Sequence, residues 1–157
     1  MAPAKCSYTV FSHRKGCRNR FDLKLFDGFI PYDDKPVSLG ITFDECLNFR
    51  PHVQKLKDKC ASRLNIIRIL SHKSWKLEKK TLISLYKALI GSVLDYSSFI
   101  CSGLSDELPN ALQAIQNAAV RAIYHVPRKD HTPADTLCSM ANLDKVNTRM
   151  TELSVIK

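Results

Sequence analysis

The sequence contains few glycines and no long apolar run. Its five glycines are isolated from one another, so it has no glycine-rich loop of the kind that cradles phosphate groups. Even the most apolar stretch, residues 82–101, contains Lys87 and Asp95, and no window reaches the roughly 18–20 apolar residues that a membrane-spanning helix needs. No apolar run follows the first residues to mark a secretory signal. We therefore expect a soluble, intracellular protein, nuclear or cytoplasmic, with no membrane partner.

The cysteines and histidines lack the spacing of a metal site. The six cysteines form no Cys-x-x-Cys pair, and the five histidines stand alone. Scattered cysteines in an intracellular chain are most often small buried apolar residues. The sequence therefore predicts no metal ligands, no disulfide partner and no catalytic thiol.

Positive charge is abundant and unevenly distributed. The formal net charge is +9, and residues 47–80 alone hold ten bases against two acids, whereas residues 25–46 hold one base and five acids. A concentrated basic face favours a polyanionic partner, which for an intracellular chain usually means nucleic acid. The alternative is a lysine-rich helix face that is only solvated.

The first third of the chain, residues 1–47, has the alternation of β-strands. Apolar side chains alternate with polar ones in residues 21–25, and Asp27-Gly28 is a strong turn signal before a returning strand at residues 29–30. Residues 8–11 form a further β-favouring run, and residues 37–43 alternate as one strand. We expect a small antiparallel sheet piece that is marginally stable by itself.

From residue 48 to residue 127 the apolar spacing becomes helical. Asn48 is a plausible N-cap for a first helix through Leu70, with Pro51 tolerated in its first turn. A second helix is predicted from about Trp75 to Ile100, with a bend or close contact at Gly91. Its apolar stripe runs through Leu82, Leu85, Leu89, Val93 and Tyr96 and is broadened by Ile83, Ile90 and Leu94. A third helix runs from Ser105 to the stop at Pro127.

The last segment, residues 128–157, reads as a short helical extension. Thr132 before Pro133 is a cap signature for a fourth helix through Met140, and Leu143 to Lys157 is helical without a stop signal. We expect this last helix to be cut before its end. The fold class is therefore α+β, a small β-rich piece (1–47) followed by a bundle of three to five helices (48–127) and the extension.

No self-contained active site is evident. Asp33-Asp34 is the only candidate for the paired carboxylates that hold Mg²⁺ in nucleotidyl transfer, but flanking prolines and Lys35 indicate a polar turn. The strongest functional feature is the cationic side chains of residues 50–80, which could follow a phosphate backbone and release counterions. They are Arg50, Lys55, Lys57, Lys59, Arg63, Arg68, Lys73, Lys76, Lys79 and Lys80.

Two aromatic residues flank this basic stretch. Phe49 and Trp75 could stack on bases. For Trp75 we favour the alternative that the indole packs under the loop between helices.

Five segments along the chain form a recognisable series. They read KCSYTVFS at 5–12, VSLGITFD at 37–44, LNFRPHV at 47–53, LYKALI with VLDY at 85–96, and LQAIQNAAVR at 112–121. In this order they resemble the end of the palm and the thumb of reverse transcriptases from non-LTR retrotransposons, the jockey-like and related elements. Asn48 stands where the family commonly has Thr, which is harmless for capping. The resemblance covers about residues 5–150.

The resemblance implies specific roles. Lys5 would be the general-acid lysine of an intact polymerase, and Leu39, Gly40 and Ile41 would belong to a primer-grip hairpin, with Gly40 inside a strand. Lys55, Lys59 and Arg63 would hold the template–primer duplex as surface side chains, and Arg121 would be structural or face the duplex. The partners would be RNA or an RNA–DNA template–primer duplex and the missing palm and fingers.

The resemblance also implies what this chain lacks. The aspartates that bind Mg²⁺ would lie upstream of Met1, so the chain has no cofactor of its own and no expected activity alone. Two alternatives remain: a non-enzymatic helical interaction module with a solvated basic face, and, with least support, an intact small enzyme.

Overall fold

The computed structural model describes residues 6–12, 21–25, 28–101 and 107–155. The chain divides into two compact units, residues 1–54 and residues 55–157. The α+β class is confirmed, because short antiparallel hairpins precede a series of helices. The domain boundaries predicted after residues 47 and 127 stay predictions. Lys5 lies outside the described residues.

The first unit contains two hairpins with very short strands. β1 (Lys24–Leu25) pairs with β2 (Gly28–Phe29), as the alternation predicted, although the turn residue Asp27 is outside the described residues. The segment 8–11 forms only an isolated bridge between Tyr8 and Tyr32.

The second hairpin corrects the expected strand over residues 37–43. β3 (Val37–Ser38) folds back on β4 (Ile41–Thr42), and Leu39 and Gly40 form the two-residue turn between them. Both turn residues have positive φ, 49° and 78°, which is the mirror-image type I′ geometry that suits the twist of a hairpin. Alternating apolar residues continue through this turn, so periodicity alone does not detect it.

A polar cap leads from this hairpin into α1 (Arg50–Leu70). Asp44 accepts hydrogen bonds from the backbone N–H groups of Asn48 and Phe49, at 3.2 and 2.6 Å, and the Asn48 side chain accepts one from the N–H of Arg50 at 3.1 Å. The N-cap position is thus Phe49, one residue after the predicted Asn48, although the Asn48 side chain does satisfy an N–H of the first turn. Pro51 lies in the first turn, where no N–H is needed. Asp44 supplies a second acceptor that the sequence did not identify.

The helix predicted from Trp75 to Ile100 begins at Lys79 and contains a π turn. A 3₁₀ turn, η2 (Lys73–Trp75), is followed by α2 (Lys79–Tyr86), a π-helical turn η3 (Lys87–Gly91) and α3 (Ser92–Cys101). The wider π turn changes which side chains face inward. Leu82, Ile90 and Leu94 are buried together with Tyr86, whereas Tyr96, expected on the inner stripe, is 62% exposed.

The remaining helices follow the prediction more closely. α4 (Glu107–Tyr124) buries Leu112, Ala119 and Ile123, and it ends at His125, whose φ of 55° lets the N–H of Val126 bond back to the carbonyl of Arg121.

Two short helices complete the chain. α5 (Ala134–Ala141) is capped by Pro133 and not by Thr132, with no side-chain cap bond, and α6 (Val146–Val155) follows. The cap prediction at Thr132 was therefore wrong by one residue.

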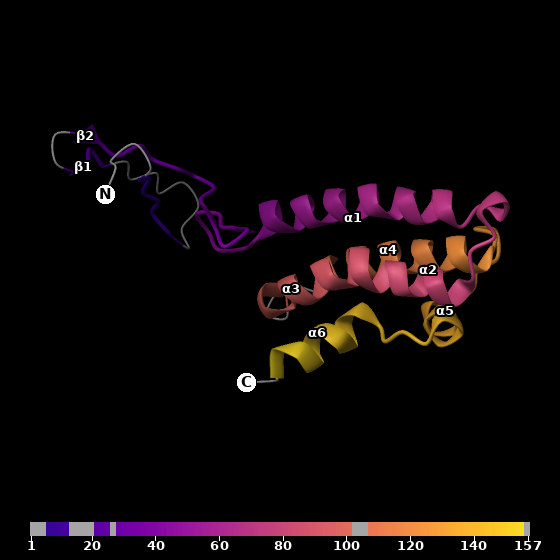
Figure 1. Cartoon of the computed structure of the whole chain (residues 1–157). Helices are drawn as coiled ribbons and strands as arrows, with labels where there is room; N and C mark the ends of the chain where they lie inside the picture. The colour runs from indigo at the N-terminus through magenta and orange to yellow at the C-terminus, as the bar shows by residue number, and fades with distance from the viewer. Residues whose placement is uncertain (1–5, 13–20, 26–27, 102–106, 156–157) are drawn as a thin grey trace. The chain divides into compact units, whose positions relative to one another are not determined.

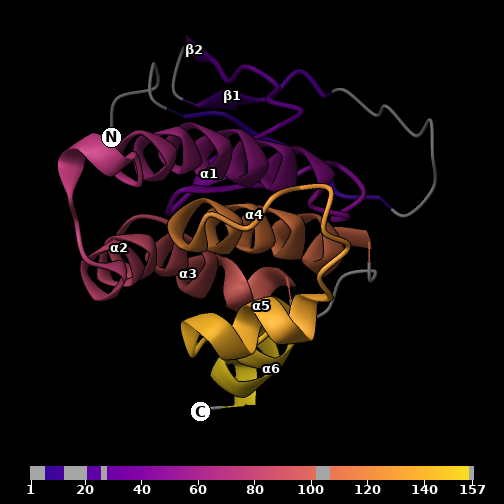
Figure 2. The same ribbon diagram turned by 90° about the vertical axis from the view of Figure 1, so that its right-hand side faces the viewer.

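The second unit packs its helices around one main apolar core. In both views the part of α1 from Lys55 onward lies on one side, α5 and α6 lie on the other, and α2, α3 and α4 run between them (Figures 1 and 2). α3 packs against α6, and α4 packs against α2, α5 and α6. The core residues of this unit include Leu56, Cys60, Leu64 and Ile67 from α1, Tyr86, Ile90 and Leu94, Leu112 and Ile123, and Val146 and Met150. Among the residues that the structure describes, none of the helices has the length and apolar character needed to cross a membrane.

Candidate nucleic-acid interface

The cations of α1 lie beside its buried stripe. Leu56, Cys60, Leu64 and Ile67 face the core of the second unit, and most of the positions between them are exposed. Lys55, Lys59 and Arg68 are exposed, and Lys57 is half-buried. Arg50, the first residue of α1, is exposed and belongs to the first unit.

The cations occupy two edges of α1. Lys55, Lys59 and Arg63 recur every four residues and therefore share one edge of the helix. Lys57 and Arg68 are eleven residues apart, about three helical turns, and share the edge on the other side of the buried stripe. The structure thus separates the predicted set into two rows.

Arg63 is not the surface side chain that was expected. It is half-buried, and its Nη1 donates a hydrogen bond to the backbone carbonyl of Leu89, in the π turn η3. Its guanidinium therefore joins α1 to η3, because a wider turn alters the regular pairing of backbone carbonyls. Reversing the charge of Arg63 would remove this contact.

The other lysines surround the connection between α1 and α2. Lys73 and Lys76 are exposed on the loop, and Lys79 and Lys80 open α2. The Nζ of Lys79 lies 4.8 Å from the centre of the Tyr124 ring, close enough for a cation–π interaction. Trp75, which we favoured as a side chain packed under this loop, is instead 57% exposed.

The primer-grip-like residues lie at the tip of the β3–β4 hairpin. Leu39 is 84% exposed, Gly40 follows it in the turn, and Ile41 begins β4. The expectation that Gly40 lies inside a strand was therefore wrong. Its positive φ explains the glycine, since other L-residues adopt this conformation at a cost.

The acidic pair Asp33-Asp34 forms a bend, as predicted. Asp33 accepts a hydrogen bond from the backbone N–H of Lys35 at 3.0 Å, and the carboxylate of Asp34 lies 4.0 Å from the Lys35 Nζ. Within the described parts of the chain, no three His, Cys, Asp or Glu residues come together as metal ligands would. These residues do not fit a Mg²⁺ site of the polymerase type, which needs converging carboxylates.

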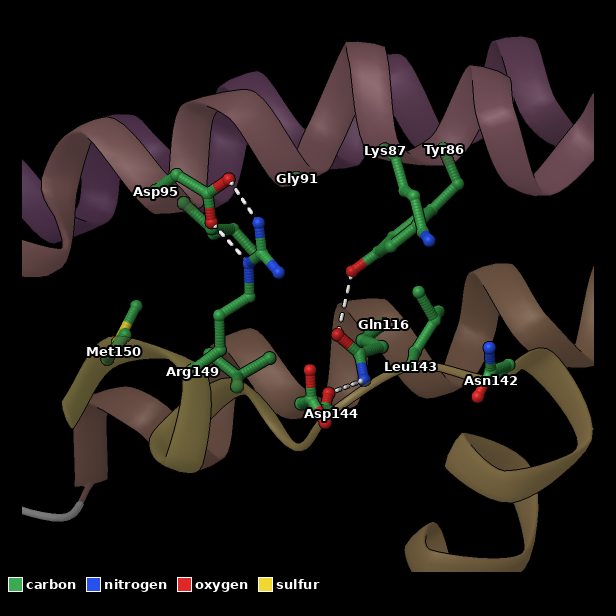
Figure 3. Close-up of a pocket in the computed structure, with 12 residues that line it drawn as sticks. Tyr86, Lys87, Gly91, Asp95, Gln116, Asn142, Leu143, Asp144, Arg149 and Met150 are labelled. Carbon is green, nitrogen blue, oxygen red and sulfur yellow. Dashed lines mark hydrogen bonds and ion pairs between the residues drawn. The ribbon is translucent and has the colours of Figure 1, made fainter. Parts of the chain in front are cut away.

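A cavity of about 180 Å³ opens between α2–α3, α4 and α6, lined by polar residues that the sequence did not single out. In Figure 3, Arg149 of α6 faces Asp95 of α3 and Tyr86 points toward Gln116 of α4. The Arg149 Nε and Nη2 donate to the two Asp95 oxygens at 2.6 and 2.7 Å, which raises the pKa of Arg149.

The inner part of this cavity is a buried hydrogen-bond chain. The hydroxyl of Tyr86 donates to Gln116 Oε1, and Gln116 Nε2 donates to the backbone carbonyl of Asp144, each at 2.8 Å. Burial raises the pKa of Tyr86, so its hydroxyl stays protonated and remains a donor. We interpret this network as a seam that joins α2, α4 and the start of α6, because its groups bind one another.

Comparison with known proteins finds similarity over half of the chain. The chain is 32% identical over 78 residues to the "Retrovirus-related Pol polyprotein from type-1 retrotransposable element R1" of Bradysia coprophila. The matched region is 50% of this chain but only 8% of that protein. No model of a protein family matches the chain, and no solved structure does. Half of this α+β chain is therefore similar in sequence to a small part of a retrotransposon Pol polyprotein.

Proposed function

We propose that this chain is the thumb-type region of a retrotransposon reverse transcriptase. In this proposal it binds template–primer nucleic acid but does not itself catalyse nucleotide addition. The observation that carries the proposal is the similarity to a retrotransposon Pol polyprotein. The order of elements agrees with it, since short hairpins precede a helical bundle whose first helix is rich in cations.

The grip would be electrostatic. Lys55 and Lys59 are exposed one turn apart on α1, and Lys73, Lys76 and Lys80 are exposed around the following loop. Lysines that neutralise phosphates release condensed counterions, which gives affinity without sequence preference. The exposed Trp75 on the same loop could stack on a base.

The bond-forming chemistry would belong to other parts of a polymerase. Palm and fingers would supply the carboxylates that hold Mg²⁺, and Lys5 could act as a general acid only beside them. We expect no primer extension by this chain with Mg²⁺ and nucleotides. Extension above a control without protein would overturn this part of the proposal.

Binding to an RNA–DNA duplex at several salt concentrations tests the grip. With six to ten phosphate contacts, affinity measured by fluorescence anisotropy should fall about 10³- to 10⁵-fold between 50 and 200 mM salt. The double variant Lys55→Glu, Lys59→Glu should weaken binding strongly with an unchanged melting temperature. Arg63 is left intact, because it holds η3.

The matched control reverses two exposed lysines outside the basic stretch, Lys35 and Lys87. This control should weaken binding only slightly, although its net charge changes by the same amount. Affinity that does not depend on salt would contradict the proposal and favour the helical interaction module.

One observation favours that module as a second candidate. Ile66 and Ile69 are 46% and 60% exposed, one turn apart on α1, and could contact an apolar partner surface. Weak duplex binding that is the same in the unmodified chain and in Lys55→Glu, Lys59→Glu would support this candidate over the first, because its basic face is only solvated.

A further inference from the structure

A hollow of about 420 Å³ lies between the end of α1, the outer face of α4 and the segment after α4. Three arginines line it, one from each of these parts: Arg68, Arg121 and Arg128. Asn117 and a row of alanines that includes Ala118 form its floor on α4. All of these residues belong to the second unit.

The positive charges in this hollow have no carboxylate partners among the described residues. Arg68 donates to the neutral side chain of Asn65 at 3.1 Å, and Arg128 makes no described hydrogen bond or ion pair. Among the residues that the structure describes, none that lines the hollow is acidic. Like charges brought together without counter-charges repel one another, and such a concave surface attracts anions.

Arg121 is held in place by neutral groups. Its Nη1 donates to the backbone carbonyls of Pro127 and Asp130 at 2.9 and 3.0 Å, and its Nη2 donates to that of Thr132 at 3.0 Å. These bonds fix the loop after α4 but leave the charge of the guanidinium unneutralised. Of its five N–H donors, about two stay available for an oxyanion.

The alanine floor allows a close approach. Ala118 and its neighbours on the outer face of α4 carry no side chain that would fill the space between the arginines. A phosphate group could therefore reach more than one guanidinium, and the planar fork of an arginine pairs well with two phosphate oxygens. Asn117 adds a neutral donor and acceptor at the floor.

We propose that this hollow, called here the arginine groove, binds the sugar-phosphate backbone of nucleic acid. The inference rests on the proposed function and gives the duplex a specific path across the bundle. A repeating anion fits better than a single one, because Lys57 and Arg68 line up along about three turns of α1 and lead toward the groove. The groove thus joins one edge of α1 to α4, which the sequence did not connect.

The test compares variants for binding to a labelled RNA–DNA duplex. Arg68→Gln, Arg128→Gln should lower affinity about tenfold or more and reduce the slope of log affinity against log salt by about 2, as expected when two phosphate contacts are lost. Arg121 is left intact because it supports the loop. The control Lys35→Gln, Lys87→Gln removes the same charge from exposed positions outside the groove and should change affinity less than about threefold.

Each outcome decides the inference. If the arginine variant keeps the duplex affinity of its control while Lys55→Glu, Lys59→Glu weakens binding, the arginine groove does not bind the duplex. The proposed function then stands without it. If the unmodified chain shows no salt-dependent binding, both fall together. If the arginine variant loses binding to polyglutamate but not to the duplex, the partner is an acidic protein segment and the inference is overturned.

Two further measurements separate loss of binding from loss of fold, and polymer binding from binding of a single anion. If the double variant melts at a lower temperature, the single variant Arg128→Gln takes its place, because Arg128 has no described partner and its loss should reduce the salt slope by about 1. Inorganic phosphate should compete for the groove only weakly. Competition by phosphate equal to that by duplex phosphates would contradict a polymer-binding groove.

Discussion

At the scale of single residues, two arginines use their charge to bind backbone carbonyls. Arg63 donates to Leu89 in η3, and Arg121 donates to three carbonyls after α4. Both were identified in the sequence as cations, but neither contact could be seen from spacing, because the partners of Arg63 and of Arg121 lie on other segments. A basic residue in a basic stretch can therefore hold two segments of the fold together.

Replacing Arg63 by Met should destabilise the fold. The change keeps an apolar stem but removes the charged donor to the Leu89 carbonyl, which should lower the free energy of unfolding by about 1.5–3 kcal/mol. Urea denaturation measures this difference. Arg68→Met is the control, since among the described residues Arg68 bonds to the neutral Asn65 at the surface, and its loss should cost about 0.5 kcal/mol or less. Equal losses in the two variants would contradict the structural role of Arg63.

Tyr86→Phe should destabilise the seam around Gln116. The change removes the donor to Gln116 Oε1 in a buried site, which should cost about 1–3 kcal/mol in the free energy of unfolding. The ordinary pKa of tyrosine is about 10, and burial raises it in the fold, so the folded state binds the proton more tightly than the unfolded state. The contribution of Tyr86 is thus complete below pH 10 and declines as the pH rises above it.

Urea midpoints measured from neutral pH upward test this sign. The difference between the unmodified chain and Tyr86→Phe should be constant up to about pH 10 and then shrink, because only the unmodified chain has the titrating hydroxyl. A difference that grows with pH would show that the hydroxyl is more acidic in the fold than in the unfolded chain. The buried thiol of Cys60, whose pKa is also raised by burial, is present in both proteins and cancels.

At the scale of elements, the π turn η3 decides which side chains enter the core. The sequence predicted one helix whose stripe ended at Tyr96, but the extra width of η3 rotates α3 relative to α2. After this turn Leu94, which the sequence placed on the broadened stripe, is buried, whereas Tyr96 is exposed. Apolar spacing assumes 3.6 residues per turn, so a local change in pitch cannot be detected from it.

Gly91→Ala should stabilise the chain. A Cβ at Gly91 would lie 3.8 Å from the carbonyl oxygen of Tyr86 and 3.9 Å from the Cβ of Lys87, which are ordinary contact distances. Alanine loses less backbone entropy than glycine on entering a helix, so the free energy of unfolding should rise by about 0.5–1 kcal/mol. This outcome would exclude the close helix contact that the sequence allowed at Gly91.

Gly40→Ala is a control for which we expect a change in stability of the opposite sign. Gly40 has a φ of 78° in the β3–β4 turn, where a side chain is strained, so this change should destabilise the hairpin by about 1 kcal/mol. Thermal denaturation measures the effect of Gly91→Ala, and backbone amide exchange in β3 and β4 measures that of Gly40→Ala. Shifts of both variants in the same direction would contradict the assigned conformations.

At the scale of the whole molecule, the first unit has little core of its own. Its hairpins contain two residue pairs each, and several large apolar side chains are exposed, among them Phe29 at 64% and Val37 at 60%. Short exposed strands and apolar side chains can pair with other chains. This agrees with a sheet piece that needs a neighbouring surface, as the alternation in residues 1–47 predicted.

The isolated chain should therefore self-associate through its first unit. Sedimentation velocity should show concentration-dependent association, and Phe29→Thr, Val37→Thr should reduce it while keeping strand-forming residues. The control Ile66→Thr, Ile69→Thr removes exposed apolar surface from α1 instead. Association that is reduced only by the α1 control would place the contact on the second unit.

Much of the local structure could be predicted because it depends on neighbouring residues. The bond from Asn48 to the first turn, the place of Pro51, the apolar stripe of α1, and the stop of α4 before Pro127 follow from side chains within a few positions of each other. The turn at Leu39-Gly40 could have been found from its glycine, but the apolar Leu39 in a positive-φ position concealed it.

The candidate interface was predicted in composition but not in arrangement. The sequence identified the ten cations of residues 50–80, and the structure distributes them over two edges of α1, a loop and the start of α2. The arginine groove includes Arg121 and Arg128, which are more than fifty residues from Arg68 in sequence. No periodicity within one helix could have indicated that these charges meet.

The amino-acid sequence by itself determined the fold class, the main helices and the excess of positive charge, because propensity, capping and apolar spacing act over a few residues. Only the tertiary structure decided that Arg63 ties α1 to η3, that Tyr86 is buried, and that three arginines share one hollow. These outcomes depend on which distant elements pack together and at what helical pitch, and the free energy of such contacts is shared between segments that no local pattern relates.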